Sequence, residues 1–427
     1  MSILMFLVII IAYIVVIGTL NEKIFHMQSD IALIFFSFVF SVILLFIKKM
    51  TSMELLSEFA KSIQDFEFAA YLMDGVLCFM LFAGASKVNM TKFKQNLKPI
   101  CLLALLATVI SSFLYGALFY VAALILGIHG DMWVCILLGC VVSPTDPIAA
   151  TGILSKIGLS KNVCSVIENE SLFNDGTGVT LFVFVRSFVI KSENTNVLIL
   201  ITKEIAGAVV IALVISFALF KLMKITKDPI RYILISLLDV SLVYIICEHL
   251  GCSGVIASVV CGMYFSYEMH KMDRRVAVID PENYYRDFWE ILESILNAIL
   301  FVMIGMLVFC MTPCKNFLAV VLLSILALVV SRAVGVFISS ILARRKIPGN
   351  YNLTEFTVLM TWSALKGGLS LALALGTKEY LSPDIYHVFI NVAYAAIFFT
   401  VLIQGLTVKK AYFALEKHKA ERIHVQS

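Results

Sequence analysis

Apolar and polar segments alternate along nearly the whole chain. The apolar segments are about twenty residues long and apolar on every face, a pattern that predicts transmembrane helices rather than barrel strands. They predict thirteen spans, at residues 3–20, 31–47, 69–88, 99–127, 132–155, 162–190, 197–223, 230–247, 253–267, 288–310, 316–341, 353–376 and 385–408. We therefore expect an all-α polytopic membrane protein with about thirteen transmembrane helices.

The composition agrees with this fold class and excludes a soluble protein. Of the 427 residues, 61% are hydrophobic and only 15% are charged. The connections between the segments are short, so residues 1–427 are expected to form a single transmembrane domain with a short cytoplasmic tail at 409–427. We expect this tail to be a solvated end rather than a nucleic-acid-binding patch, and the lipid bilayer to be the main partner.

The basic residues predict the orientation of the chain. Most of the 33 lysine and arginine residues lie in connections on the same side as Lys23, Lys92, Lys161 and the C-terminal tail. Connections rich in lysine and arginine face the cytoplasm. We therefore expect a multi-pass protein of the plasma membrane with its N-terminus outside and its C-terminus in the cytoplasm.

Two predicted spans are interrupted. Ser143-Pro144-Thr145-Asp146-Pro147 breaks the fifth span, because each proline removes a backbone donor and disrupts the helix. Lys366-Gly367-Gly368 breaks the twelfth. The two interruptions are seven spans apart, so their helices run in opposite directions. Paired broken helices in inverted repeats are typical of secondary transporters, and we expect these two to cross at the membrane midplane.

Polar side chains in the fifth and sixth spans indicate a cation site. A carboxylate near the bilayer centre costs about 3 kcal/mol, so Asp146 indicates a place where an ion is held, and Thr145 adds further oxygen atoms. The alternative is a proline kink in which Asp146 pairs with a basic neighbour. In the sixth span, Glu168, Ser171 and Asp175 share one helical face at spacings of three and four residues. Such residues must line a cavity or pair with buried cations.

Two basic residues, Arg332 and Lys366, lie deep inside predicted spans. Arg332 needs a buried partner, and Glu170 is the best candidate, so this pair is predicted to be structural. Lys366 lies at an interruption, where it can compensate the charge of half-helix carbonyl ends. A direct role of either cation in a transport cycle is the alternative. Gly176 and Gly178 would let another backbone approach the sixth span closely.

The segments SPTDPIA and ENESLFNDGTG, followed by the arginine-containing span and WSALKGGLSLALAL, resemble the NhaP-type sodium/proton antiporters. These belong to the monovalent cation/proton antiporter family, and the resemblance covers all thirteen predicted spans. It implies inverted repeats, a homodimer and elevator-like alternating access. In that scheme, a core that includes the spans of 131–190 and 316–376 moves against a dimerisation domain formed by the remaining spans.

The resemblance also implies roles for five residues of the site. Asp175 corresponds to the principal carboxylate for cation and proton. Asp146, Thr145 and Ser171 correspond to further ligands of Na+, and Asn174 to a residue that orients or holds the site. In family terms, asparagine followed by aspartate at 174–175 implies electroneutral one-for-one exchange.

Other positions either match the family or depart from it. Glu170 and Arg332 match its structural ion pair. Lys366 stands where many relatives have arginine, and lysine is not equivalent because it can lose its proton when buried. Some relatives also add a glutamate from the third span, where this chain has Ala83. Whether Asp74, more than two turns away, supplies the missing acid is left open by the sequence.

The expected function is secondary transport, with neither enzyme activity nor a bound cofactor. Na+, with Li+ as a second candidate, would exchange for H+ because both compete for Asp175. A K+/H+ antiporter and a Na+-coupled symporter of an organic solute are the alternatives. The Gly-Cys-Ser-Gly segment 251–254 also matches the Gly-x-Ser-Gly pattern of intramembrane serine proteases. No later histidine in mid-span could serve as the base, so Ser253 is better explained as a helix N-terminus.

Overall fold

The computed structural model describes residues 3–50, 68–128, 130–146, 148–190, 197–226, 228–271 and 281–426. In these ranges the regular structure is helical, apart from one isolated β-bridge between Asp146 and Leu365. Eight helices of the described residues are long and apolar enough to cross a membrane, and Tyr71–Ser86, Met132–Val142 and Gly254–Met269 are shorter apolar helices. The expected all-α membrane fold is confirmed.

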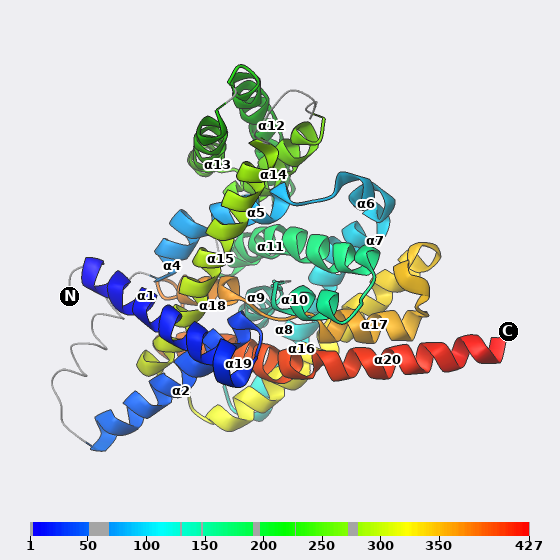
Figure 1. Cartoon of the computed structure of the whole chain (residues 1–427). Helices are drawn as coiled ribbons and strands as arrows, with labels where there is room; N and C mark the ends of the chain where they lie inside the picture. Colours follow the sequence, from blue (N-terminus) through cyan, green and yellow to red (C-terminus); the bar gives the residue numbers. More distant parts are fainter. Residues whose placement is uncertain are drawn as a thin grey trace.

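The helices follow one another as in Figure 1. The first are α1 (Ile3–Leu20), α2 (Ser29–Met50), α4 (Phe68–Ala70), α5 (Leu77–Ser86), α6 (Met90–Gln95), α7 (Leu97–Cys101), α8 (Thr108–Ile125), α9 (Met132–Val142), α10 (Ile148–Lys156) and α11 (Lys161–Val189). They continue with α12 (Val197–Met223), α13 (Pro229–His249), α14 (Gly254–Met269), α15 (Pro281–Leu307), α16 (Phe317–Ala343), α17 (Leu353–Trp362), α18 (Gly368–Leu375), α19 (Pro383–Phe398) and α20 (Gly405–Gln426). Short π or 3-10 segments adjoin several of them: η1 (Asn21–Phe25), η2 (Tyr71–Val76), η3 (Leu102–Ala107), η4 (Val308–Cys310), η5 (Arg344–Lys346), η6 (Pro348–Asn350) and η7 (Phe399–Gln404).

Small residues let the central helices pack closely. α8 packs against both α9 and α16. A Cβ atom at Gly139 of α9 would lie 2.1 Å from the carbonyl oxygen of Ser112, and one at Gly335 of α16 would lie 2.7 Å from that of Ala107. Lipid is as apolar as the side chains, so close van der Waals packing of this kind holds membrane helices together. Figure 1 shows α12, α13 and α14 grouped at one end of the molecule, beside these central helices.

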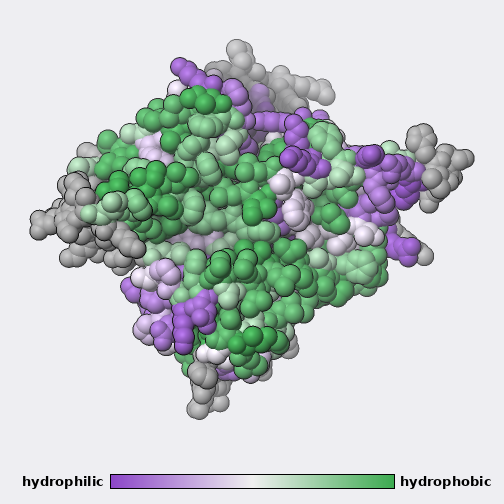
Figure 2. Space-filling model, turned by 90° about the horizontal axis from the view of Figure 1, so that it is seen from below, coloured by the Kyte–Doolittle hydropathy of each residue, from purple (hydrophilic) through white to green (hydrophobic). Residues whose placement is uncertain are grey.

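Apolar side chains dominate the outer surface. Figure 2 shows a broad hydrophobic face with hydrophilic residues gathered toward its margins. Leu234 and Leu238 of α13 and Leu322 and Leu326 of α16 are all more than half exposed. Because the exposure of so much apolar surface to water is unfavourable, this is the surface that faces lipid.

The two interruptions meet in the interior. α9 ends at Val142 and α10 begins at Ile148, and α17 ends at Trp362 and α18 begins at Gly368. The backbone N–H of Asp146 donates to the carbonyl oxygen of Leu365 at 2.8 Å, so the two unwound segments satisfy part of each other's hydrogen bonding. A Cβ atom at Gly367 would lie only 3.0 Å from Cβ of Asp146, and glycine permits this close approach.

The C-terminal helical segment is longer than expected. α19, η7 and α20 continue to Gln426, and α20 packs against α10 and α17. Arg422 donates through Nε and Nη2 to the carboxylate of Glu355, both at 3.1 Å, and through Nη2 to the carbonyl oxygen of Asn350 at 2.9 Å. The segment predicted to be a solvated tail, 409–427, is therefore helical to Gln426 and held against the start of α17.

Replacement of Arg422 by glutamine is expected to destabilise the protein by about 1–3 kcal/mol, because the buried Glu355 carboxylate would lose its charged hydrogen bonds. Arg231→Gln is the matched control, since Arg231 is exposed and approaches Asp228 only at 3.7 Å. Thermal unfolding in detergent should give a lower midpoint for the first variant alone. Equal midpoints would mean that the contact between α20 and α17 does not contribute to stability.

Candidate ion-binding site

Side chains of α11 support the unwound segment after α9. Asn174 accepts a hydrogen bond from the backbone N–H of Thr145 at 3.2 Å and donates to Thr145 Oγ1 at 2.6 Å and to Glu170 Oε1 at 3.0 Å. Ser171 donates to the carbonyl oxygen of Thr145. Outside a helix these backbone groups lack intrahelical partners, and α11 supplies them. Ser171 and Asn174 are buried and do not line the cavity at this site, so they anchor the segment from behind.

Both buried cations have partners. Arg332 of α16 donates to the two carboxylate oxygens of Glu170, at 3.0 and 3.1 Å. Lys366, which follows α17, donates through Nζ to the carbonyl oxygen of Ser143 at 2.9 Å. Ser143 lies at the C-terminal end of α9, where the helix dipole concentrates partial negative charge. The ammonium group therefore lies where charge compensation was expected.

Pro144 packs directly on α11. A Cβ atom at Gly178 would lie 2.7 Å from Cγ of Pro144, whereas one at Gly176 would lie 3.1 Å from Cγ1 of Ile256. The sequence predicted that a second backbone approaches these glycines, but the groups in contact are side chains, and the closest is the ring of Pro144 at Gly178. This contact brings the interruption against the face of α11 that also carries Asp175.

Gly178→Ala is expected to push Pro144 away from α11 and to cost about 1–3 kcal/mol of stability, together with a large part of any transport activity. Gly176→Ala is the control on the same helix, because the flexible Ile256 side chain can move aside. Thermal unfolding and transport by the two reconstituted variants would be compared. If the alanine at Gly176 proved as harmful as the one at Gly178, the contact with Pro144 would not be what positions the site.

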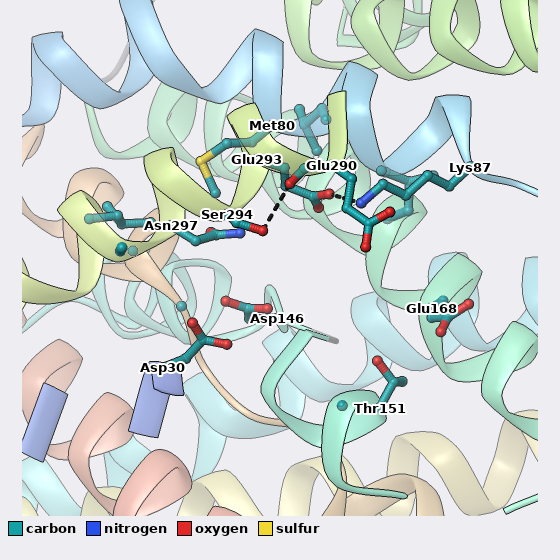
Figure 3. Close-up of a pocket in the computed structure, with 18 of the residues that line it drawn as sticks. Asp30, Met80, Lys87, Asp146, Thr151, Glu168, Glu290, Glu293, Ser294 and Asn297 are labelled. Carbon is teal, nitrogen blue, oxygen red and sulfur yellow. Dashed lines mark hydrogen bonds and ion pairs between the residues drawn. The ribbon is translucent and has the colours of Figure 1, made fainter. Parts of the chain in front are cut away.

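A cavity of about 950 Å³ passes along the interruption. Thr145, Asp146 and Asp175 line it, and it extends as far as Lys92 and Lys161, which lie in or beside connections between helices. Asp146 and Asp175 are both only partly buried. Figure 3 shows Asp146 facing this space from below, with residues of α15 on the opposite wall. The two aspartates are therefore neither sealed off nor far from a route to the exterior.

Asp175 faces the cavity without a protein partner. It forms no hydrogen bond or ion pair with any other residue that the structure describes. Asp146, Glu170 and Lys366 are close enough to act on it electrostatically. Two carboxylates that face one cavity offer the hard oxygen ligands that alkali cations prefer, and their negative charge favours a cation or a proton between them.

Polar residues of α2 and α15 also line the cavity, and the sequence motifs did not indicate them. These are Asp30 of α2 and Glu293 and Asn297 of α15, and Glu293 forms an ion pair with Lys87. Asp30 and Glu293 each have a serine neighbour, and Asn297 stands alone among apolar residues. The cost of a polar group in or beside an apolar segment is the sequence signal that indicates all three.

The third span contributes no carboxylate to the cavity in the part of the chain that the structure describes. Ala83 of α5 is buried and does not line the cavity. Asp74 lies in η2, and its side chain is outside the described residues. Further acidic residues of the cavity therefore come from other helices, such as Asp30 of α2 and Glu293 of α15.

The Gly-x-Ser-Gly match at 251–254 has a structural explanation. Ser253 is the N-cap residue of α14, and its hydroxyl oxygen accepts a hydrogen bond from the backbone N–H of Ile256 at 3.3 Å. A Cβ atom at Gly254 would lie 2.7 Å from the ring of Tyr244, so this glycine serves close packing. The segment begins a helix, as expected.

Comparison with known proteins agrees with this geometry. Residues 11–414 match the family described as "Sodium/hydrogen exchanger, transmembrane". The chain is 30% identical to the Na+/H+ antiporter NhaP of Pseudomonas aeruginosa over 95% of this chain and 96% of that protein. It is also 30% identical to the Na+/H+ antiporter ApNhaP of Aphanothece halophytica, over 77% of this chain and 62% of that protein.

A solved structure shows the same fold. The sodium proton antiporter MjNhaP1 of Methanocaldococcus jannaschii superposes with a TM-score of 0.77 at 19% identity, covering 97% of this chain and 99% of that chain. The match extends along nearly the full length of both chains. Together with the match at residues 11–414, it leads to one assignment: the protein belongs to the sodium/hydrogen exchanger family of membrane proteins.

Proposed function

We propose that this protein exchanges Na+ for H+ across the plasma membrane. The observation that carries the proposal is that Asp146 and Asp175 line one cavity, beside two interrupted helices that touch each other. An empty site with two negative charges would be costly to move through the membrane centre. Either Na+ or H+ relieves that charge, so only loaded states cross and the two fluxes are coupled. The two similar proteins are named as Na+/H+ antiporters, which supports Na+ as the cation.

The residues of the site divide into two groups in this proposal. Asp146 and Asp175, with oxygen atoms of Thr145, hold the cation, and Asp175 takes the proton when the cation leaves. Ser171 and Asn174 keep the unwound segment in place through their hydrogen bonds to Thr145. The ion pair of Glu170 with Arg332 and the bond from Lys366 to α9 then act as fixed supports.

The proposed cycle is electroneutral, with one Na+ exchanged for one H+. The core containing α9–α11 and α16–α18 moves against the remaining helices, which also form a homodimer. The N-terminus lies outside and the C-terminus in the cytoplasm, so the cavity opens to the cytoplasm in this conformation. The lysines along its rim support this orientation, because basic connections remain on that side.

Uptake of radioactive Na+ into proteoliposomes, driven by an outward proton gradient, tests the proposal. We expect uptake that needs no organic solute and that excess K+ inhibits less than excess Na+. At acidic pH, H+ and Na+ compete for one site, so the apparent KM for Na+ should rise about tenfold for each unit by which the pH is lowered. The rate at saturating Na+ should not change. Uptake that required an organic solute, or a KM independent of pH, would contradict antiport at a shared carboxylate.

A further inference from the structure

Asp30 is an acidic residue that the proposed exchange does not yet use. It lies in the first turn of α2, is partly buried and lines the cavity. Its carboxylate accepts a hydrogen bond from Gln28 Nε2 at 2.7 Å, but it forms no ion pair with a basic residue among those that the structure describes. The positive end of the α2 dipole favours a carboxylate here, but no basic side chain of the described residues neutralises it, so its charge is available to a mobile cation.

Asn297 of α15 is a second group without an explanation. Its side chain is only 2% exposed, and it lines the same cavity. Its Oδ1 atom has no hydrogen-bond partner in the described part of the chain. Buried polar atoms are normally satisfied, and a cation or its hydration water in the cavity would satisfy this one. Figure 3 shows Asn297 and Asp30, which come from α15 and α2, beside the space that Asp146 also faces.

Contacts between α2 and α15 place these two side chains at the same depth. The helices pack together, and Ser37 lies against Gly305. Asp30, which precedes Ser37, lines the same cavity as Asn297, which precedes Gly305, so the two helices run in the same direction. Both rise by about 1.5 Å per residue. Asp30, seven residues before Ser37, is therefore level with residue 298, next to Asn297.

Residues of α15 and of the segment before α2 also touch the two interrupted helices. A Cβ atom at Gly368 would lie 2.5 Å from the side chain of Leu300, which is three residues after residue 297. A Cβ atom at Gly152 of α10 would lie 3.5 Å from Gln28 Nε2, the group that bonds to the acid of α2. α15 and the residue just before α2 are thus in contact with the two interrupted helices, at Gly368 and at Gly152.

We propose that Asp30 and Asn297 form a second cation-binding site on the α2–α15 wall, which receives Na+ from the open side before Asp146 and Asp175 take it over. The carboxylate supplies charge, the amide supplies a carbonyl oxygen, and water completes the oxygen shell. This inference rests on the proposed Na+/H+ exchange. Because α2 and α15 are not among the interrupted helices, the ion changes partners as it crosses the cavity.

The test compares variants of the full-length protein in proteoliposomes at about 0.15 M background salt, which screens distant charges. Asp30→Asn should raise the KM for Na+ about tenfold, the effect of one lost charge near the ion, without changing the maximal rate. Asn297→Leu should raise it less, and Asn297→Asp should lower it. The double variant Asp30→Asn/Asn297→Leu should fall short of the combined single effects, since both residues serve one site. Glu290→Gln is the control, because it removes a charge from the exposed rim of the same cavity. Its KM for Na+ and its maximal rate should equal those of the wild type.

Two results would overturn the proposal. One is that Asp30→Asn has the same KM for Na+ as Glu290→Gln. The other is that Asp30→Asn loses its maximal rate while its KM for Na+ is unchanged. Binding of radioactive Na+ to the purified protein separates this inference from the proposed function. If the wild type failed to exchange, the exchange proposal would fail, but weaker Na+ binding by Asp30→Asn would still support the site and unchanged binding would refute it. Thermal unfolding is measured for each variant to confirm that it is folded. If Asp30→Asn does not fold, Asp30→Ser takes its place.

Discussion

Asp175→Asn abolishes Na+/H+ exchange while the protein remains folded; this is the largest effect that we expect from a single substitution. Asparagine has nearly the same shape as aspartate but can neither carry a negative charge nor release a proton at neutral pH. Asp175 has no protein partner in the described structure, so its replacement breaks no hydrogen bond or ion pair. Proton-driven uptake of Na+ by the reconstituted variant should fall to that of empty liposomes.

Glu168→Gln is the matched control for this experiment. Glu168 lies on the same helix as Asp175 and lines the same cavity, and its replacement by glutamine removes the same charge. Unlike Asp175, it is exposed, and it lies almost two turns away. We expect this variant to keep most of its exchange activity and the thermal stability of the wild type. Substantial exchange by Asp175→Asn, or an equal loss in both variants, would rule out Asp175 as the shared carboxylate.

Arg332→Met is expected to cause the largest loss of stability, about 3–5 kcal/mol, because it leaves the buried charge of Glu170 without its partner. Glu170 also accepts a hydrogen bond from Asn174, which holds Thr145. The unpaired charge should therefore disturb the ion site as well, and exchange should fall together with the midpoint of thermal unfolding.

The double variant Glu170→Gln/Arg332→Met separates the charge from the packing. It removes both charges, so much of the lost stability should return, whereas the amide of the new glutamine can still bond to Asn174. Arg186→Gln is a control at the end of α11, where the guanidinium lies 4.9 Å from the ring centre of Tyr380 and contributes little. A double variant no more stable than Arg332→Met would show that the pair matters through its packing and not through charge neutralisation.

The apolar segments were sufficient to predict most of the helices. A segment that must satisfy all its backbone hydrogen bonds within lipid has almost no choice but to be helical. The errors lie where helices leave the membrane: α15 begins at Pro281 rather than near 288, and α20 continues to Gln426 beyond the predicted end at 408. Charged helical extensions such as these are stabilised by tertiary contacts like that of Arg422 with Glu355, which hydropathy does not report.

Local chemistry also predicted part of the site. Two prolines around Asp146 indicate a broken helix from the sequence, since proline cannot continue the hydrogen-bonding pattern. A lone arginine in an apolar segment requires an acid, and the structure pairs Arg332 with Glu170. The helical spacing placed Glu168 and Asp175 on one face, because the period of the helix is fixed, and both line the cavity.

What required the folded protein is the relation between segments that are far apart in the chain. Asp30 and Asn297 reach the cavity because α2 packs along α15, and that register depends on contacts such as Ser37 with Gly305. Likewise, Thr145 and Asp175 line the cavity whereas Ser171 and Asn174 lie behind it, although all belong to the same two segments. Helical periodicity assigns a residue to a face, but the neighbouring helices decide whether that face meets water, lipid or another backbone.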